Sequence, residues 1–301
     1  MRYFAGFALL GIVLIATSAP TLAQPGPTFS AGYELFPHSE ISDPDTDAAT
    51  TFLDTGTIRV GTLTLTGAYP MIWGEGRTVL VNEVSYRRFD LDYDGFPSGA
   101  DNPQNMQAIQ YAATVTHGLS DRWTFMGIAK PGIASDFEGD VGTDDVTFQA
   151  VAIFIRAYSE RLQIGYGAAW DNSFGQPFPL PILAINWNNG GRLRLSTILP
   201  ANLEVWYAAS QRMEVGMLLN VDGNQYHGDR DIYGVDNPLL QYSVGTIGPA
   251  LNLGLGEGMM LGLRAGTTFM RRFEFADGSK DVGDYSLKNA GFLNVSLAVA
   301  L

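Results

Sequence analysis

The sequence predicts an all-β protein, a transmembrane antiparallel up-and-down β-barrel of 14 strands, with 12 strands as the alternative count. Three observations lead to this fold class. The chain begins with an export signal, and it ends in a stretch whose apolar residues occupy alternate positions. Charged residues make up only 16% of the chain, whereas about 25% is usual in soluble domains. A wall that faces lipid would show this deficit.

The N-terminus has the three parts of a secretory signal peptide. Arg2 supplies a basic start, residues 4–16 form a short apolar core, and residues 21–23 read Thr-Leu-Ala, a small-x-small cleavage site. We therefore expect residues 1–23 to be removed. Residues 24–301 show no linker and no sustained shift of composition, so we expect them to form a single outer-membrane barrel domain.

The last eleven residues alternate between a wholly aliphatic face and a small or polar face. Successive side chains of a strand point to opposite faces, so the aliphatic residues are expected to face lipid and the polar ones the lumen. The lipid-facing candidates are Leu293, Val295, Leu297, Val299 and Leu301. The lumen-facing candidates on this strand are Asn294 and Ser296.

The first half of the barrel is expected to contain seven strands, separated by turn signals. Apolar and polar residues alternate well in residues 106–117. In residues 57–73 the apolar parity changes at Gly61, which we interpret as a β-bulge. Pro131 weakens the strand that contains it. The seven strands are residues 29–36, 57–73, 77–91, 106–117, 122–135, 146–158 and 161–170.

The second half is expected to contain seven more strands. Residues 213–221 alternate cleanly except at Leu218, and a slip of parity occurs near Gly248. If residues 199–202 form only a kink, the pairing shifts and the count becomes 12. The seven strands are residues 178–187, 192–198, 203–209, 213–221, 239–255, 259–275 and 285–301.

The connections between these strands alternate in length, as in outer-membrane barrels, which have short periplasmic turns and longer external loops. Most of the acidic residues fall in the long connections, which include residues 222–237 and 276–284. The aromatic residues near the strand ends are compatible with interfacial girdles. They are Tyr69, Trp73, Trp123, Trp170, Trp187, Trp206 and Tyr207.

A second group of charged residues lies within the strands themselves. A charge that faces lipid is costly, so these side chains are expected to face the lumen, where they would line a channel or pair across it. The candidates are Arg59, Glu83, Arg87, Arg156, Arg194, Glu204, Glu214 and Arg264.

The composition argues against several classes of function. The net charge of −13 disfavours nucleic acid, whose phosphates require basic surfaces. There are no cysteines, and the acidic loops do not match the spacing of a calcium loop, so we expect no metal and no cofactor. His38, Ser39 and Glu40 contain the groups of a hydrolase, but neighbours in a strand point different ways and rarely form a catalytic relay. We expect that the protein is not an enzyme.

Two segments, Pro181-Ile-Leu-Ala-Ile-Asn-Trp187 and Leu199-Pro200-Ala-Asn-Leu-Glu-Val-Trp-Tyr207, resemble a block found in uncharacterised bacterial outer-membrane β-barrel families, which are grouped with porin-like proteins. The export signal and the alternating C-terminal strand resemble those of outer-membrane proteins generally, so we expect the outer membrane of a Gram-negative bacterium as the location. For such a barrel we expect outer-membrane lipid and the outer-membrane assembly machinery as partners, with small solutes possible. The block contains no catalytic motif, and such proteins commonly end in an aromatic residue where this chain ends in Leu301.

The leading hypothesis is therefore a porin-like channel or a transporter of small solutes. The sequence leaves three alternatives open. The first is a non-conducting structural or surface-interaction barrel with acidic external loops. The second is a secreted soluble β-sandwich, and the third is a lipid-modifying barrel enzyme that would use His38, Ser39 and Glu40.

Overall fold

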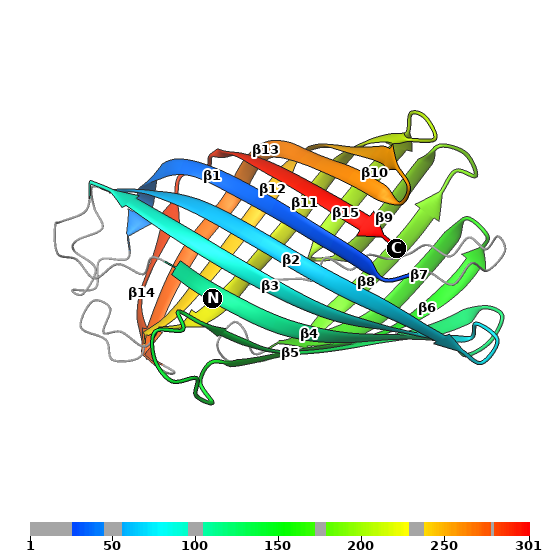
Figure 1. Cartoon of the computed structure of the whole chain (residues 1–301), viewed down its shortest axis with the longest axis horizontal. Coiled ribbons are helices and arrows are strands. Elements are labelled where there is room, and N and C mark those ends of the chain that lie inside the picture. Colours follow the sequence, from blue (N-terminus) through cyan, green and yellow to red (C-terminus); the bar gives the residue numbers. More distant parts are fainter. Residues whose placement is uncertain (1–25, 45–55, 96–104, 172–178, 229–237, 278–279) are drawn as a thin grey trace.

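The structure is a computed structural model that describes residues 26–44, 56–95, 105–171, 179–228, 238–277 and 280–301. The expected signal peptide, residues 1–23, and parts of the long connections lie outside these residues. The described chain forms one antiparallel up-and-down sheet that closes on itself (Figure 1). No helix in the described ranges is long and apolar enough to cross a membrane.

The strands follow one another around the wall in the order of the sequence. Their bounds are β1 (Thr28–Pro44), β2 (Thr57–Trp73), β3 (Thr78–Asp94), β4 (Asn105–Gly118), β5 (Trp123–Ser135), β6 (Val146–Ser159), β7 (Leu162–Asp171), β8 (Leu180–Asn188), β9 (Leu193–Leu199), β10 (Asn202–Ala208), β11 (Met213–His227), β12 (Pro238–Gly256), β13 (Met259–Asp277), β14 (Lys280–Leu287) and β15 (Gly291–Ala300).

The barrel has 14 strands because β14 and β15 are two halves of the last strand. Both halves pair with β13 on one side and with β1 on the other. They are separated at residues 288–290, where the Lys288 amide donates to the Glu40 carbonyl, 2.8 Å away. The predicted fold class and count are confirmed, and the alternative of 12 strands is wrong.

The expected bulge at Gly61 is wrong, because β2 pairs with β3 without a shift from Thr57 to Trp73. The change of apolar parity has another cause. Ile58 and Val60 are fully buried on the inner face, whereas beyond Gly61 the apolar residues such as Leu65 and Tyr69 are exposed on the outer face. The parity change therefore marks a boundary along the barrel axis. On the side of this boundary that contains Ile58 and Val60, the inner face is apolar.

Two expected loops are also wrong, because their residues continue strands. Residues 222–227 belong to β11, and Ala276 and Asp277 belong to β13, which pairs with β14 through a short connection. Asp222, which we placed in a loop, consequently lies on the inner face of the barrel. Polar residues inside a wide barrel keep the strand pattern but mimic the composition of a loop, which is why composition misplaced them.

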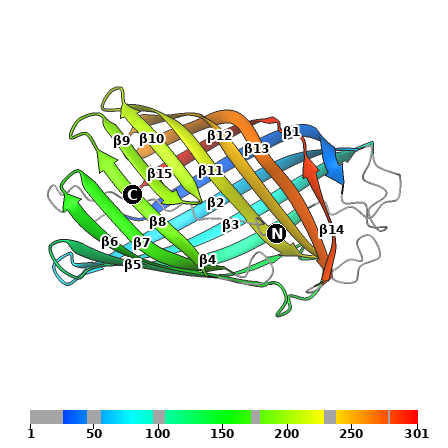
Figure 2. The same cartoon turned by 180° about the vertical axis from the view of Figure 1, so that it is seen from behind.

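The strands differ in length on the two sides of the barrel. β7 to β10 have seven to ten residues, whereas β1 to β3, β12 and β13 have 17 to 19. Figure 2 shows β6 to β10 in the left half of the view only, while β12, β13 and β14 reach the right-hand end. We call the left-hand end of Figure 2 the short-turn end and the opposite end the long-loop end.

The long strands close a narrower ring at the long-loop end. There β5 and β11 pair in parallel at Ser135 and His227, and the Asp136 amide donates to the His227 carbonyl at 3.1 Å. His227 Nδ1 also lies 3.4 Å from a carboxylate oxygen of buried Asp145. The wall is therefore a ring of 14 strands at the short-turn end and a ring of nine, β1 to β5 and β11 to β14, at the long-loop end.

Hydrogen bonds within the turn and to β11 hold the connection between the two short strands β9 and β10. Asn202 Oδ1 accepts from the Ile198 amide at 2.9 Å, and the Thr197 hydroxyl donates to the Asn202 carbonyl at 2.5 Å. The Ala201 carbonyl accepts from the Val221 amide at 2.8 Å. A seven-residue strand rises only about 23 Å along its own length, so this turn lies within the height of a lipid-facing belt of about 25 Å.

We expect an Asn202→Ala variant to lower the free energy of unfolding by about 1–3 kcal/mol, because the buried Ile198 amide loses its acceptor. The matched control is Asn189→Ala, since Asn189 Oδ1 caps the exposed turn between β8 and β9, where water replaces the lost acceptor. Urea unfolding in lipid vesicles, followed by tryptophan fluorescence, measures both. Equal losses in the two variants would contradict a water-free β9–β10 turn.

Candidate functional site in the barrel lumen

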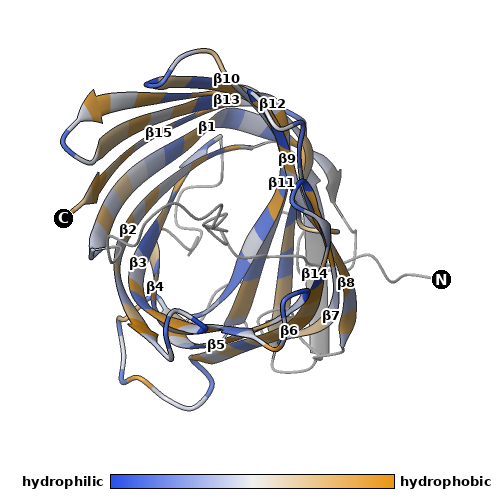
Figure 3. Ribbon diagram, turned by 90° about the vertical axis from the view of Figure 1, so that its right-hand side faces the viewer, coloured by the Kyte–Doolittle hydropathy of each residue, from blue (hydrophilic) through white to orange (hydrophobic). Residues whose placement is uncertain are grey.

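The outer face of the wall is apolar over most of its described height. On β15, Leu293 is 50% exposed, Leu297 is 42% exposed and Val295 is exposed as well, and Leu301, the residue after β15, is also exposed. Val299 shares their parity and pairs with exposed Phe29 of β1. All five lipid-facing candidates thus lie on the outer face, and Figure 3 shows the resulting bands of alternating hydropathy along the ribbons.

Exposed aromatic residues accompany this apolar face, as the girdle hypothesis expects. Trp206 is the exception: it is buried on the inner face, where its indole nitrogen donates to Glu204 at 2.9 Å. The aromatic residues on the outer face include Tyr69, Trp73, Trp123, Trp170, Trp187 and Tyr207.

Most of the charged candidates lie on the inner face. The parity of buried neighbours and the cross-strand partners place them there. These residues are Glu83, Arg87, Arg194, Glu204, Glu214, Arg264, Asn294 and Ser296.

Two arginines do not lie in the lumen. Arg156 alternates with inward Ile153 and Ile155, so it faces outward, and its guanidinium lies 5.6 Å from the Trp123 ring and 4.9 Å from the Tyr158 ring. At the short-turn end, a long side chain can keep its charge at the lipid surface while its stem covers apolar area. Arg59 lies between the inward residues of β2, faces outward, and pairs with Asp92 at 2.9 Å.

A polar layer crosses the lumen near the middle of the barrel. Arg87 of β3 and Asp222 of β11 form an ion pair of 3.2 Å, although their strands are not neighbours in the wall. The pair therefore spans the interior. Glu34 of β1 belongs to the same layer, because its carboxylate interacts electrostatically with Asp222 and Arg87. The Asn294 amide nitrogen of β15 lies 3.5 Å from the Glu34 carboxylate. This layer holds both signs of charge, and the side chains of Arg87 and Asp222 are 29% and 30% exposed.

A second polar group lies toward the short-turn end. Arg194 of β9 donates to Glu214 of β11 at 2.8 Å, and Asn252 of β12 donates to the same carboxylate oxygen at 3.3 Å. The Arg194 guanidinium also lies 5.5 Å from the ring of Trp206. These residues give the wide end of the lumen a polar lining.

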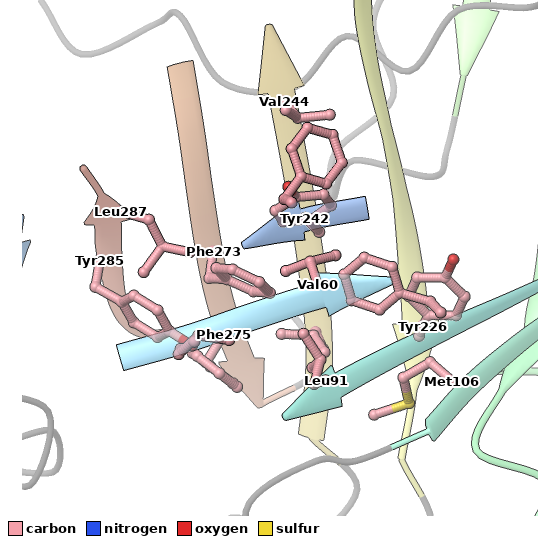
Figure 4. Close-up of a cluster of buried hydrophobic side chains, with 14 of the residues drawn as sticks. Val60, Leu91, Met106, Tyr226, Tyr242, Val244, Phe273, Phe275, Tyr285 and Leu287 are labelled. Carbon is pink, nitrogen blue, oxygen red and sulfur yellow. The ribbon is translucent and has the colours of Figure 1, made fainter. Parts of the chain in front are cut away.

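The nine-strand ring is filled by an apolar core, which we call the aromatic cluster. Each of its nine strands contributes at least one residue, and β6 to β10 contribute none. Figure 4 shows labelled side chains from β2, β3, β4 and β11 to β14 gathered in it, and the rings of Phe89 on β3 and Tyr242 on β12 meet across the interior. The cluster consists of Phe36, Ile58, Val60, Phe89, Leu91, Met106, Ala108, Ala134, Tyr226, Leu240, Tyr242, Val244, Phe273, Phe275, Tyr285 and Leu287.

Ring size explains why the lumen closes there. With strands about 4.8 Å apart and tilted by about 40°, 14 strands enclose a ring about 28 Å across, and nine strands one of about 18 Å. Side chains just fill a barrel of about eight strands. Phe89 stands at the centre of the aromatic cluster, with ring centroids 4.9 Å from Tyr242, 5.6 Å from Tyr226 and 6.4 Å from Phe273.

The hydrolase groups do not converge. His38 lies 3.7 Å from Asp92, the Ser39 hydroxyl accepts from Arg271 at 2.6 Å, and Glu40 pairs with Lys288 on the exposed surface. Ser39 faces inward while its two neighbours are exposed. Within the described ranges, no group of three or more His, Cys, Asp or Glu residues has the geometry of a metal site.

A closed 14-strand wall, apolar outside and polar within, defines a β-barrel of the outer-membrane type, and the soluble β-sandwich alternative is wrong because the sheet has no free edge. The chain belongs to the family described as "Domain of unknown function (DUF6268)", whose model matches residues 79–299. The matched residues contain the two segments, residues 181–187 and 199–207, that carry the resemblance. The predicted membership of an uncharacterised outer-membrane barrel family is therefore confirmed. No curated protein matches the sequence.

Solved barrels are similar at low identity. The COG4313 outer membrane channel from Pseudomonas putida F1 is 13% identical, with 92% of this chain and 96% of that chain covered and a TM-score of 0.46. The Pseudomonas putida toluene transporter TodX is 9% identical over 91% and 89% of the two chains, with a TM-score of 0.37. The NanC porin is 8% identical over 91% and 100%, with a TM-score of 0.38.

Sequence reasoning missed several charged residues of the lumen, including Glu34, Asp222 and Arg271. Asp222 was hidden by the polar composition around it, although it continues the inward parity of Glu214 on β11. Arg271 was not singled out at all. The available signal was its position on the same parity as Phe273 and Phe275, because an arginine among apolar positions of a strand is unusual.

Proposed function

We propose that the protein is a channel for small solutes in the outer membrane of a Gram-negative bacterium, with the long-loop end outside. On this proposal residues 1–23 are a cleaved signal peptide, and the assembly machinery of the outer membrane inserts the barrel. The protein has no enzymatic role. The outer-face residues of β15 contact lipid, and the polar layer and the short-turn polar group line the path of the solute.

One observation carries the proposal. The wide, polar lumen is closed at the nine-strand ring by side chains of the described wall, chiefly aromatic rings such as Phe89 and Tyr242. Side chains change rotamers on much shorter timescales than a wall rearranges. A closure made of rings can therefore open for a solute and close again without unfolding any strand.

The same closure favours a second candidate, a non-conducting barrel that acts as a structural or surface-interaction protein. The two candidates differ in a direct measurement. The purified barrel in planar bilayers should give discrete conductance steps if it is a channel. If neither the wild type nor a variant with a truncated side chain in the aromatic cluster conducts, the result supports the non-conducting candidate instead.

Ion selectivity provides a sharper test of the polar layer. In an Asp222→Asn variant the Arg87 guanidinium loses the charge of its partner. Removing one charge beside the path changes the energy of a passing ion by about 1 kcal/mol in a wet lumen, which corresponds to about fivefold. We expect the ratio of anion to cation permeability, from reversal potentials in a salt gradient, to rise by this amount.

The matched control is Asp92→Asn, because Asp92 is an exposed acid that pairs with Arg59 on the outer face. It removes the same charge without touching the lumen, so the permeability ratio should stay at the wild-type value. A shift of equal size in both variants would show that ions do not pass beside Asp222.

A further inference from the structure

We propose that the aromatic cluster is a binding site for a small amphipathic anion, in which Arg271 holds the carboxylate and the surrounding rings hold an apolar body. This inference deepens the proposed function, on which it rests, because it names the substrate class of the channel. The ligand is a carboxylate attached to an aromatic ring or a short alkyl chain.

Arg271 is a buried cation that is only partly satisfied. It lies on the inner face of β13, in register with Val244 of the aromatic cluster, and it is 1% exposed. Its Nη1 donates to the Ser39 hydroxyl at 2.6 Å. In the described part of the chain, its Nε and Nη2 have no hydrogen-bond partner, and it forms no ion pair with a carboxylate.

Burial of an ionised group is unfavourable unless the group is paired and fully hydrogen-bonded. The ring of Phe36, 5.2 Å from the guanidinium carbon, offsets only part of that cost through a cation–π contact. A methionine of similar length would fill the same space without the cost. The arginine is therefore explained better by an anion that it binds than by its contribution to folding.

The two unpartnered nitrogens determine the chemistry of the ligand. Nε and Nη2 present parallel N–H groups along one edge of the guanidinium, which is the fork that carboxylates accept in a bidentate manner. The Tyr242 hydroxyl is also buried and lies close enough to Arg271 to interact with it, and a phenol can donate a hydrogen bond to a ligand held there. The two unpartnered nitrogens of Arg271 and the neighbouring Tyr242 hydroxyl therefore lie in the same region of the aromatic cluster.

The surroundings select an apolar body over an inorganic anion. Tyr242 and Phe273 lie 4.6 Å apart between ring centroids, and Phe89 and Tyr226 stack at 5.6 Å. Rings favour contact with another flat apolar group. A phosphate dianion would have to lose its hydration in these surroundings with a single arginine as its counter-charge, which is unfavourable.

The wall beside Arg271 is irregular at three places, which gives the site room to adapt. The register of β1 shifts between Phe36 and Ser39, that of β12 and β13 shifts between Gly245 and Thr246, and the last strand breaks at residues 288–290. Such bulges re-aim side chains and are frequent next to sites. The rings that cover the guanidinium must rotate when the ligand enters.

The test is calorimetric titration of the full-length mature barrel, in detergent micelles, with three probes of similar shape. Benzoate carries the carboxylate, benzamide is its neutral counterpart and benzylamine is a cation. We expect one benzoate per barrel, with benzamide binding at least about tenfold more weakly because a charged hydrogen-bond partner is lost. We expect no saturable binding of benzylamine, and inorganic phosphate should fail to compete with benzoate.

Variants of neighbouring arginines localise the site. Arg271→Met should weaken benzoate binding at least about tenfold, and Arg271→Lys, which keeps the charge but loses the fork, should be intermediate. Arg272→Met is the matched control, because Arg272 is the next residue of β13 and pairs with Glu274 at 3.2 Å. It should keep the wild-type affinity within about twofold.

The inference is overturned if benzamide binds as tightly as benzoate, if Arg271→Met keeps the wild-type affinity, or if benzoate does not bind. The outcome is separable from that of the proposed function. A barrel that conducts ions but does not bind benzoate retains the channel and loses the ligand class. A barrel that binds benzoate through Arg271 but never conducts retains the site and loses the channel.

Discussion

A Leu297→Arg variant will fail to assemble in the membrane, whereas an Asn294→Arg variant on the same strand will assemble like the wild type. Leu297 lies on the outer face of β15, in register with Ala31 of β1 and Leu261 of β13. An arginine that faces hydrocarbon costs about 2–4 kcal/mol near the middle of the bilayer. This is a large fraction of the stability of a typical domain.

Asn294 is a matched control because it differs mainly in the direction of its side chain. It faces the lumen beside Glu34, so a new guanidinium at this position finds both water and a carboxylate. The measurement is the amount of barrel in the outer-membrane fraction, together with its heat-modifiable mobility in a gel. If both variants assemble equally well, the aliphatic outer face of β15 does not contact lipid, and the membrane-spanning role of this strand is contradicted.

A Phe89→Ala variant will conduct more than the wild type and will unfold more easily. Phe89 is 2% exposed and contacts three other rings in the aromatic cluster. Its truncation removes packing worth about 3–5 kcal/mol. The space that it leaves lies at the narrowest part of the lumen, so we expect larger conductance steps in planar bilayers and a lower urea midpoint in vesicles.

The control for this variant is Phe29→Ala, because Phe29 is an exposed ring on the outer face of β1. It should leave the conductance at the wild-type value. If Phe89→Ala unfolds more easily but conducts as the wild type does, the aromatic cluster is a structural core and not the closure of a channel.

The wall of the barrel could be predicted from the sequence because its physics is local. Alternation of apolar and polar residues, turn signals and the lengths of connections are enough to count 14 strands. They also orient most charged side chains, including Glu214 and Arg264. Arg156 was misplaced because alternation alone does not show how far along the barrel axis a residue lies. Near the lipid surface a long side chain can reach water from the outer face.

The contents of the lumen could not be predicted, because they depend on contacts between strands far apart in the sequence. The apolar residues Ile58 and Val60 have the opposite parity to those after Gly61, and we interpreted this change as a bulge. The sequence did not show that the inner face is apolar at Ile58 and Val60, which explains the change without a bulge. The pairing of Arg87 with Asp222 and the meeting of Ser135 with His227 are likewise long-range. Only the narrowing of the wall brings these residues together.

The contact between β5 and β11 divides the chain topologically. Because Ser135 and His227 already meet, everything between them, β6 to β10, is a single long excursion that leaves the narrow ring and returns to it. A hairpin added to or removed from this excursion preserves the direction of every later strand. Relatives should therefore differ in strand number here, so the internal volume can evolve separately from the aromatic cluster.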